Sequence, residues 1–594
     1  MQTLMRHAVR GGLRRGLTGF LVIGLMGATG GCTGSVGGTH TSGSGGKSGS
    51  SSGGGNGSGS GGNGSGSSSG GSSGSSSGGS NGGVVTCQPG VPATSQIPRM
   101  TRLQYNNVIK DLLGLDKLST AGNVAPSELL APDSKGSLTD IAWNGYLSAA
   151  EKIAGEVMAN ATLKAKFIGC DAAQASCLTD TIKAFGRKAF RRPLVDDEIS
   201  TFMAFNSLTP KGQPAEVAEA ILYAFLASPS FIMLPELVDQ DKENGAVKLN
   251  SYEVATRLSF LFWGSVPDEA LNTAADKNEL QSKDQILAQA QRLLMSPKAT
   301  AVATSFHRFY ATIENGTHWV NNTSHDMTKY PAFNASSYAD AMAELDAFFG
   351  DLVTSGGTFK DIFTSPNAFV TKNTAKIYGL DPAGYDTSLK KVPLDATKRP
   401  GIFTRVAFLS TFSHDTQTSP ILRGAFISGR VLGIPVGDPD PKFLTMTPPQ
   451  GNYKTNREAM DALTNPSPCN TCHTTKLNPP GYVLEHYDAV GGWQDKDPPG
   501  GDIDSTAEVM FSDTNKKTVS TAADLMAEIA KTPNAQQIYA RNWVQYASGR
   551  GQNDNDACIV DQLAKNLGDG NYAITKMMAD YTQADSFRLR TAGN

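Results

Sequence analysis

Residues 101–114 read TRLQYNNVIKDLLG, and the pattern in this segment recurs through most of the chain. Apolar side chains recur at helical spacing along it: Leu103, Val108, Ile109, Leu112 and Leu113. Thr101 is a typical helix N-cap, and Gly114 is a typical residue just past a helix C-terminus. The segment therefore predicts an amphipathic helix that begins after Thr101 and ends before Gly114.

The same helical period continues downstream, while the alternation typical of strands is scarce. Further helices are expected at about 140–167, 178–191, 195–207, 214–228, 251–263, 282–312, 336–354, 521–531, 536–548, 556–566 and 571–581. Long irregular connections are expected around 385–400 and 430–520. The predicted fold class is mainly α, with several consecutive helical modules joined by long irregular loops.

The chain has 594 residues, which is too many for one hydrophobic core. After the N-terminal region, five modules are expected: helical modules at 87–165, 166–245 and 246–385, a haem-bearing module at 386–505 and a C-terminal helical module at 506–594. The formal net charge is -3, so no overall basic field favours nucleic acid as a partner.

The N-terminus has the order of an export signal. Residues 1–31 carry basic residues and no acid, then the apolar run Leu17 to Met26, and then small residues that end at Cys32. The last part resembles the lipobox of bacterial lipoproteins, in which the cysteine is lipidated, although Thr29 replaces the usual leucine. Ordinary cleavage, which leaves Cys32 as a free thiol, is the alternative.

Glycine and serine dominate residues 33–83, within the segment 32–86. A tract of this composition cannot bury enough apolar surface to fold, and it behaves as a flexible coil. The N-terminal region therefore predicts a lipid at Cys32, a disordered tether and then a folded body. The expected location is outside the cytoplasm, in the periplasm or at the cell surface.

The sharpest chemical signal is Cys469-Asn470-Thr471-Cys472-His473. CxxCH is the attachment spacing of c-type haem: the two thiols bind the vinyl groups, and His473 is the proximal iron ligand. A redox CxxC, a structural zinc site and an inert disulfide are the alternatives. The first lacks a preceding βαβ pattern, and no second CxxC supplies zinc ligands. The predicted cofactor is covalent haem c.

The distal iron ligand is less defined by the sequence. His414, Met510 and Met446 are candidates, since each lies within reach of the motif along the chain. A methionine would give the His/Met ligation usual for electron carriers, although each methionine taken singly is more often plain core packing.

The other cysteines allow two disulfides in an oxidising compartment. Cys170 and Cys177 are close in sequence and predict a local bridge. Cys87 and Cys558 are the two cysteines left once the others are assigned, and on that ground alone they are predicted to pair across the two ends of the body.

Several segments together resemble a family of large exported bacterial proteins, frequent in planctomycetes and myxobacteria. These proteins are built from consecutive domains of unknown function around a c-type cytochrome motif. The segments that carry the resemblance are 98–107, 185–194, 258–268, 377–380, 418–424, 469–491, 546–550 and 585–587. The resemblance covers essentially all of 87–590 and implies a mainly helical, extracytoplasmic protein with a cytochrome-like module.

Two positions depart from the family pattern. Many members have histidine where this chain has Leu463, and many have aspartate where it has Asn478. If that histidine is a haem ligand, or supports such a ligand, in the other members, this chain must use another group, and His414 is then favoured.

Two further segments have open interpretations. The basic run Arg187 to Arg192 is either a solvated helix end or a docking site for an acidic partner or a haem propionate. The segment around Asp488 either wraps the haem edge or forms a turn capped by its carboxylate.

These observations predict a membrane-tethered c-type cytochrome that passes electrons to or from a redox partner protein. Two alternatives stay open. One is a haem enzyme, peroxidase-like or oxidising a carbohydrate or small molecule. The other is a surface polysaccharide-binding protein whose haem is structural or absent. Haem coordination separates the first two, since a six-coordinate haem favours electron transfer and an open distal site favours catalysis.

Overall fold

The computed structural model describes residues 90–92, 98–115, 140–208, 212–238, 241–311, 325–437, 447, 449–551 and 553–592. The predictions for the signal segment, Cys32, the tether, Cys87 and Met446 fall outside these ranges. Within them the protein is mainly helical, which confirms the predicted fold class.

The first half of the protein is a set of short and medium helices. They are α2 (Arg102–Leu113), α4 (Asp140–Ala159), α5 (Ala161–Phe167), α6 (Ala175–Ala189), α7 (Asp196–Met203), η1 (Ala204–Ser207), α8 (Pro214–Leu226), α9 (Pro229–Ile232), α10 (Ser251–Phe262), α11 (Glu269–Asp276), α12 (Lys283–Leu294) and α13 (Lys298–Tyr310). Helix α2 begins and ends as predicted: Thr101 and Gln104 form a capping box, and Gly114 has a left-handed φ of 81°.

The second half continues with mostly short helices up to the CxxCH motif and longer ones after it. They are α14 (Ala335–Thr354), α15 (Phe359–Thr364), α16 (Lys372–Ala375), η2 (Pro382–Gly384), η3 (Ile402–Thr404), α17 (Val406–Thr411), α18 (Pro420–Ala425), η4 (Phe426–Val431), α19 (Asn456–Thr464), α20 (Asn470–Cys472), η6 (His473–Leu477), α21 (Asn478–Tyr482), α22 (Ala522–Lys531), α23 (Pro533–Ser548), η7 (Asp554–Asp556), α24 (Ala557–Leu567), α25 (Ile574–Asp580), η8 (Tyr581–Gln583) and α26 (Asp585–Arg588).

Three small antiparallel sheets complete the fold. The first has the order β1 (Lys242–Glu243), β2 (Ala246–Lys248) and β7 (Leu589–Arg590). The others are hairpin-like pairs, β3 (Asn367–Val370) with β4 (Lys390–Pro393), and β5 (Ala507–Ser512) with β6 (Asn515–Val519).

The structure corrects several of the predicted segments. The helix expected at 140–167 is two helices, α4 and α5, because the Asn160 side chain caps the start of a new helix. The helix expected at 282–312 is two helices, α12 and α13, separated around Pro297, whose missing N–H and ring interrupt the helical ladder. The region 430–520 is not one irregular connection, because it contains α19, α20, η6, α21 and both strands of the β5–β6 pair.

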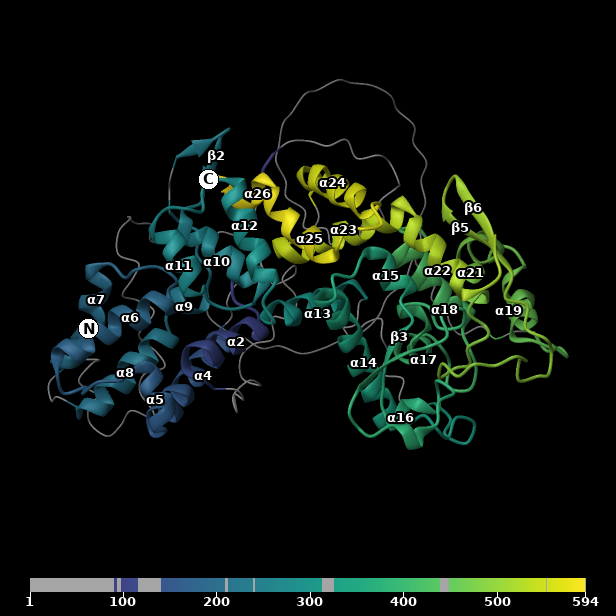
Figure 1. Cartoon of the computed structure of the whole chain (residues 1–594), viewed down its shortest axis with the longest axis horizontal. Helices are drawn as coiled ribbons and strands as arrows, with labels where there is room; N and C mark the ends of the chain where they lie inside the picture. The colour runs from purple at the N-terminus through teal and green to yellow at the C-terminus, as the bar shows by residue number, and fades with distance from the viewer. Residues whose placement is uncertain are drawn as a thin grey trace, which may run out of the picture.

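The chain runs from one end of the molecule to the other and then returns. Figure 1 shows α2 to α12 on one side, α14 to α22 on the other, and α13 between them. The C-terminal helices α23 to α26 cross back over α13, and β7 then pairs with β2. No helix in the described ranges is both long and apolar enough to cross a membrane.

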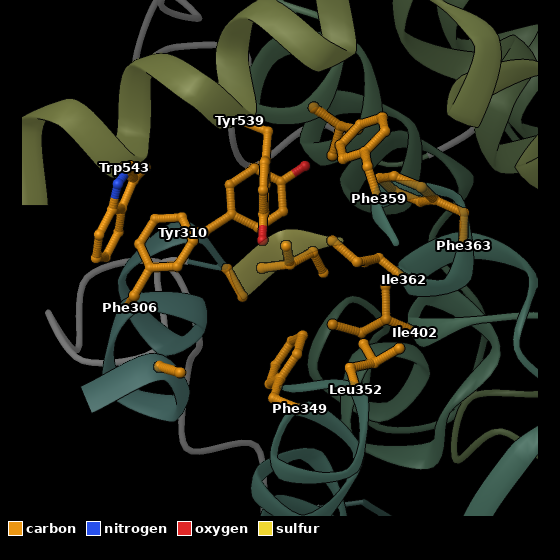
Figure 2. Close-up of a cluster of buried hydrophobic side chains, with 14 of the residues drawn as sticks. Phe306, Tyr310, Phe349, Leu352, Phe359, Ile362, Phe363, Ile402, Tyr539 and Trp543 are labelled. Carbon is orange, nitrogen blue, oxygen red and sulfur yellow. The ribbon is translucent and has the colours of Figure 1, made fainter. Parts of the chain in front are cut away.

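Two hydrophobic cores hold these helices. One lies among residues 100–266, and the other, much larger, among residues 249–587. In the larger core, aromatic side chains of α13, α15 and α23 converge: Phe306 and Tyr310, Phe359 and Phe363, and Tyr539 and Trp543 (Figure 2). The C-terminal helices are therefore bound to the centre of the protein by buried apolar contacts.

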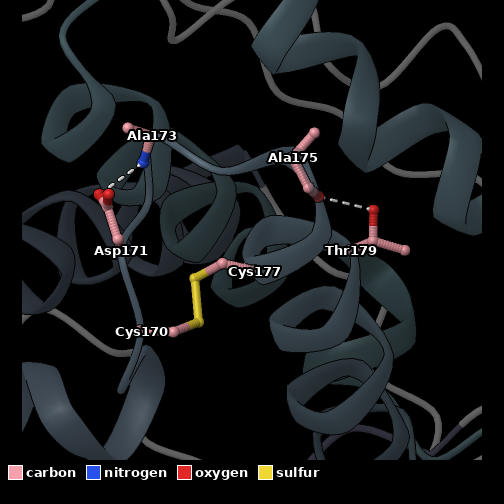
Figure 3. The surroundings of a disulfide bond; sticks show 6 residues. All are labelled: Cys170, Asp171, Ala173, Ala175, Cys177 and Thr179. Atoms are coloured by element: carbon pink, nitrogen blue, oxygen red, sulfur yellow. Dashed lines mark hydrogen bonds between the residues drawn. A yellow bond between two sulfur atoms is a disulfide. The ribbon is translucent and has the colours of Figure 1, made fainter.

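Cys170 and Cys177 form a disulfide with a Cα–Cα distance of 5.9 Å (Figure 3). The bridge joins the loop before α6 to the first turn of that helix. Cys558 is also disulfide-bonded. Its predicted partner, Cys87, lies outside the described residues.

A buried histidine makes the stability of the larger core depend on pH. His307 is 0% exposed; its Nδ1 donates to the Ala303 carbonyl at 2.7 Å, and its Nε2 accepts from the Tyr539 hydroxyl at 2.8 Å. Burial lowers the pKa of His307 to about 4, against about 6.5 in an unfolded chain. The neutral imidazole is therefore the form that the fold accepts.

Because the unfolded state binds the proton first, the stability due to neutral His307 is complete above pH 6.5. It is lost as the pH falls from 6.5 to about 4. We expect the free energy of unfolding to fall by about 2 to 3 kcal/mol more in the wild type than in His307→Gln between pH 7.5 and 4.5. Denaturant titrations at the two pH values measure this, and equal losses in both proteins would refute it.

Candidate haem-attachment site

The CxxCH motif lies on one continuous helical segment between α19 and α21. Cys469 precedes α20, and its carbonyl accepts hydrogen bonds from the backbone N–H groups of Cys472 and His473. Both cysteines are half-buried free thiols, one helical turn apart. His473 begins η6, a π-helical turn of the kind often found at functional sites.

A chain of hydrogen bonds orients the imidazole of His473. Its Nδ1 lies 3.0 Å from Oδ1 of Asn478, a residue only 1% exposed. The Asn478 Nδ2 group donates to Thr464 Oγ1 at 2.9 Å and to the Tyr482 hydroxyl at 3.0 Å. Tyr482 in turn donates to Asp461 Oδ1 at 2.7 Å. The Nε2 atom of His473 has no hydrogen-bond partner among the described residues and is left for a ligand.

The two thiols and the imidazole do not converge on one point. Within the described ranges, no group of three or more His, Cys, Asp and Glu side chains is arranged to hold a metal ion. This arrangement differs from a zinc site, where the ligands converge on one ion.

Two glycines bring α18 and α21 into backbone contact behind the motif. A Cβ on Gly424 would lie 1.7 Å from the Leu477 carbonyl oxygen, and a Cβ on Gly481 would lie 1.9 Å from that of Pro420. Ser428 of η4 adds a 2.5 Å hydrogen bond to the Lys476 carbonyl. The helices α18 and η4 thus form the support on which η6 and α21 rest.

Arg423 ties this support to the segment that follows the motif. Its buried guanidinium donates to the carbonyls of Leu484, Tyr487, Asp488 and Leu409 at 2.8 to 3.3 Å. Its nearest carboxylate, that of Glu485, lies 3.9 Å away. Burial lowers the pKa of Arg423 and raises that of Glu485, since desolvation outweighs their attraction.

Glu485 joins three elements around the motif. It is 2% exposed, and its Oε2 accepts from Thr418 Oγ1 at 2.8 Å and from Asn456 Nδ2 at 3.0 Å. Thr418 precedes α18, and Asn456 opens α19. The helix that leads into the motif and the helix behind it are therefore held by the same carboxylate.

The predicted distal ligands lie in different surroundings. Met510 is on β5, which packs against η6 and α21, and is partly buried there. His414 lies on a turn between Ser413 and Thr418 and is exposed, although partial desolvation of its imidazole lowers its pKa. Met446 lies outside the described residues. Met510 is thus the candidate on an element adjacent to the motif.

The structure shows where the side chains of the basic run Arg187 to Arg192 lie. In the basic run, Arg191 is 3% exposed, Arg187 pairs with Asp276 at 2.7 Å, and Arg192 pairs with Glu198 at 2.8 Å. A solvated helix end is therefore wrong for Arg191, which instead donates to backbone carbonyls, those of Ala189, Ser230, Phe231 and Met233.

Asp488 caps a turn, the second of its two interpretations. Its Oδ1 accepts from the backbone N–H groups of Val490 and Gly492 at 2.9 and 2.7 Å. His486, beyond the same turn, stacks on Trp493 with its Nδ1 3.0 Å from the Gln494 carbonyl.

Sequence reasoning missed the residues that orient the site. In the sequence, Asn478 stands out only as a departure from the family pattern, and nothing there assigns a role to Tyr482, Asp461, Thr464 or Arg423. The signal that was available is spacing: Asn478 is one π-helical turn after His473, and Tyr482 is one α-helical turn after Asn478.

Four family models match consecutive parts of the chain. They are Protein of unknown function (DUF1595) at residues 177–236, DUF1592 at 249–380, DUF1588 at 399–497 and DUF1585 at 515–587. The DUF1588 model, which spans the CxxCH motif, carries the name PSCyt3, which suggests an association with cytochromes.

Comparison with curated proteins and with solved structures returned no match. Together the four matched segments span more than half of the chain. The matches support a multi-module protein built from these domains of unknown function.

Proposed function

We propose that the protein is an extracytoplasmic c-type cytochrome that transfers electrons. Cys469 and Cys472 would hold the haem covalently, and Nε2 of His473 would be its proximal ligand. The haem supplies reversible one-electron chemistry. The chain's own residues would attach it through the two half-buried thiols and orient the imidazole through Asn478.

The observation that carries the proposal is the state of His473. Asn478 occupies Nδ1, and Nε2 has no hydrogen-bond partner among the described residues. The free thiols of Cys469 and Cys472 lie one helical turn before His473 and directly before it. A metal-binding histidine typically has its second nitrogen engaged in this way. The cytochrome-related name of the matching DUF1588 model agrees with this interpretation.

The disulfides support a location outside the cytoplasm. The Cys170–Cys177 bridge and the bonded Cys558 favour an oxidising compartment, where haem attachment to CxxCH also takes place. The export signal and a lipid on Cys32 would bring the protein there and hold it near a membrane. A redox partner protein would then meet it at that surface.

Covalent haem attachment tests the proposal directly. We expect the full chain, produced in a host with c-type haem maturation, to keep a haem stain on a denaturing gel. Cys469→Ala/Cys472→Ala is expected to lose the stain completely, because both covalent anchors are gone. Thr471→Ala, an exposed position inside the same motif, is the matched control and should keep it.

The absorbance spectrum then separates electron transfer from catalysis. A low-spin, six-coordinate haem supports the proposed relay, and Met510→Ala would then report whether that methionine is the distal ligand. A five-coordinate, high-spin haem would contradict the relay and favour a haem enzyme. A wild-type chain with no covalent haem would overturn the proposal altogether.

A further inference from the structure

We infer that Asn478 is a positioning residue that sets the reduction potential of the haem, through a hydrogen-bond chain that runs from His473 by way of Asn478 and Tyr482 to the carboxylate of Asp461. The inference rests on the proposed function, because it concerns the iron ligand. It goes further in assigning a role to Asn478, Tyr482 and Asp461.

The direction of every hydrogen bond in the chain is fixed. Thr464 Oγ1 donates to the Met460 carbonyl at 2.7 Å, and Tyr482 donates to the Asp461 carboxylate at 2.7 Å. Each hydroxyl has a single proton, so both must accept from Asn478. The Asn478 group that faces them is therefore its NH₂.

The carbonyl end of Asn478 consequently faces His473. A carbonyl oxygen only accepts, so Nδ1 of His473 must carry the proton. The remaining lone pair of the ring is on Nε2, the atom needed by iron. Asn478 thus selects the tautomer that can bind, and its burial keeps water from competing for the same hydrogen bonds.

The neutral amide also limits how strongly the imidazole donates electrons. A carboxylate in this place would draw the Nδ1 proton, make the ring more basic and favour oxidised iron. Tyr482 and Asn478 join Asp461 to His473, so the carboxylate polarises the hydrogen bonds along this chain. The guanidinium of Arg457, 4.6 Å from the centre of the Tyr482 ring, lies against this chain.

Two substitutions are expected to move the potential in opposite directions. Asn478→Asp is nearly isosteric and puts a carboxylate on Nδ1, so the equilibrium for reduction should fall at least tenfold, which is 59 mV more negative. Tyr482→Phe removes the link to Asp461 while the ring stays, so the potential should rise, by a smaller amount.

Spectroelectrochemical titration of the haem-loaded full chain measures both shifts. Thr475→Asp is the matched control: it adds a charge on the exposed side of η6 without contact to His473, and we expect less than a threefold change. Should Asn478→Asp fail to fold, Tyr482→Phe alone tests the inference: a positive shift of its potential supports it, and no shift beyond the control refutes it.

Shifts of the same sign, or no shift beyond the control, would overturn the inference. A structural loosening of the site does not give opposite signs, so this pattern separates orientation from general damage. A wild-type chain that keeps covalent haem while neither variant shifts would refute only the role of Asn478. A wild-type chain that binds no haem would refute the proposed function.

Discussion

Gly481→Ala is expected to destabilise the protein by about 3 to 4 kcal/mol and to reduce covalent haem loading. A Cβ at this position would lie 1.9 Å from the carbonyl oxygen of Pro420, which is backbone in α18 and cannot rotate away. Relief requires α18 and α21 to separate, which would also open the contact between Gly424 and Leu477. Overpacking that forces backbone to move lies at the costly end of core substitutions.

A helical glycine with free space around it provides the matched control. Gly155 lies in α4, and the nearest atom to a Cβ there is Glu219 Oε1 at 3.6 Å. Gly155→Ala should therefore stabilise the protein by about 0.5 to 1 kcal/mol, because alanine has the higher helix propensity. Denaturant unfolding of both variants gives the comparison, and a neutral Gly481→Ala would show that the helices can part without cost.

Local sequence patterns predicted the helices well because helices are local. The Thr101 to Gly114 segment carries its own start and stop signals, and both function as expected. Its apolar face was only partly assigned: Leu103 is 43% exposed, whereas Gln104 and Tyr105 are buried. The periodicity identifies a helix, but neighbouring elements determine which side of it is covered.

The candidate site likewise has one part that a short stretch of sequence predicts and another that depends on contacts between segments far apart in the sequence. The CxxCH spacing is contained in five residues, so the proposed attachment residues can be identified from the sequence alone. The support behind them brings α18, about fifty residues earlier, into contact with α21, and no periodicity connects the two. Arg423, Glu485 and the two contact glycines acquire their roles only through that tertiary contact.

Arg423→Met is expected to lower the free energy of unfolding by about 4 kcal/mol at neutral pH. The substitution fills most of the same volume but removes the hydrogen bonds to four backbone carbonyls around the motif. It also leaves the buried Glu485 without its compensating cation, and removing one partner of a buried pair typically costs 3–5 kcal/mol. Arg187→Met, which breaks a partly exposed pair with Asp276, is the control and should cost about 1 kcal/mol or less.

Part of the stability lost in Arg423→Met comes from the buried charge of Glu485, so this part should depend on pH. Burial already raises the pKa of Glu485, and loss of Arg423, whose charge lowers it, would raise that pKa further. The deficit of Arg423→Met should therefore shrink as the pH falls and Glu485 becomes protonated, and it should grow as the pH rises.

Adding Glu485→Gln to Arg423→Met should recover part of the lost stability at pH 7, since the amide still accepts from Thr418 and carries no charge. Thermal or denaturant unfolding of the two single variants and the double variant closes this cycle. Additive losses would show that the guanidinium acts on the carbonyls alone, whereas recovery in the double variant would show that it also offsets the charge of Glu485.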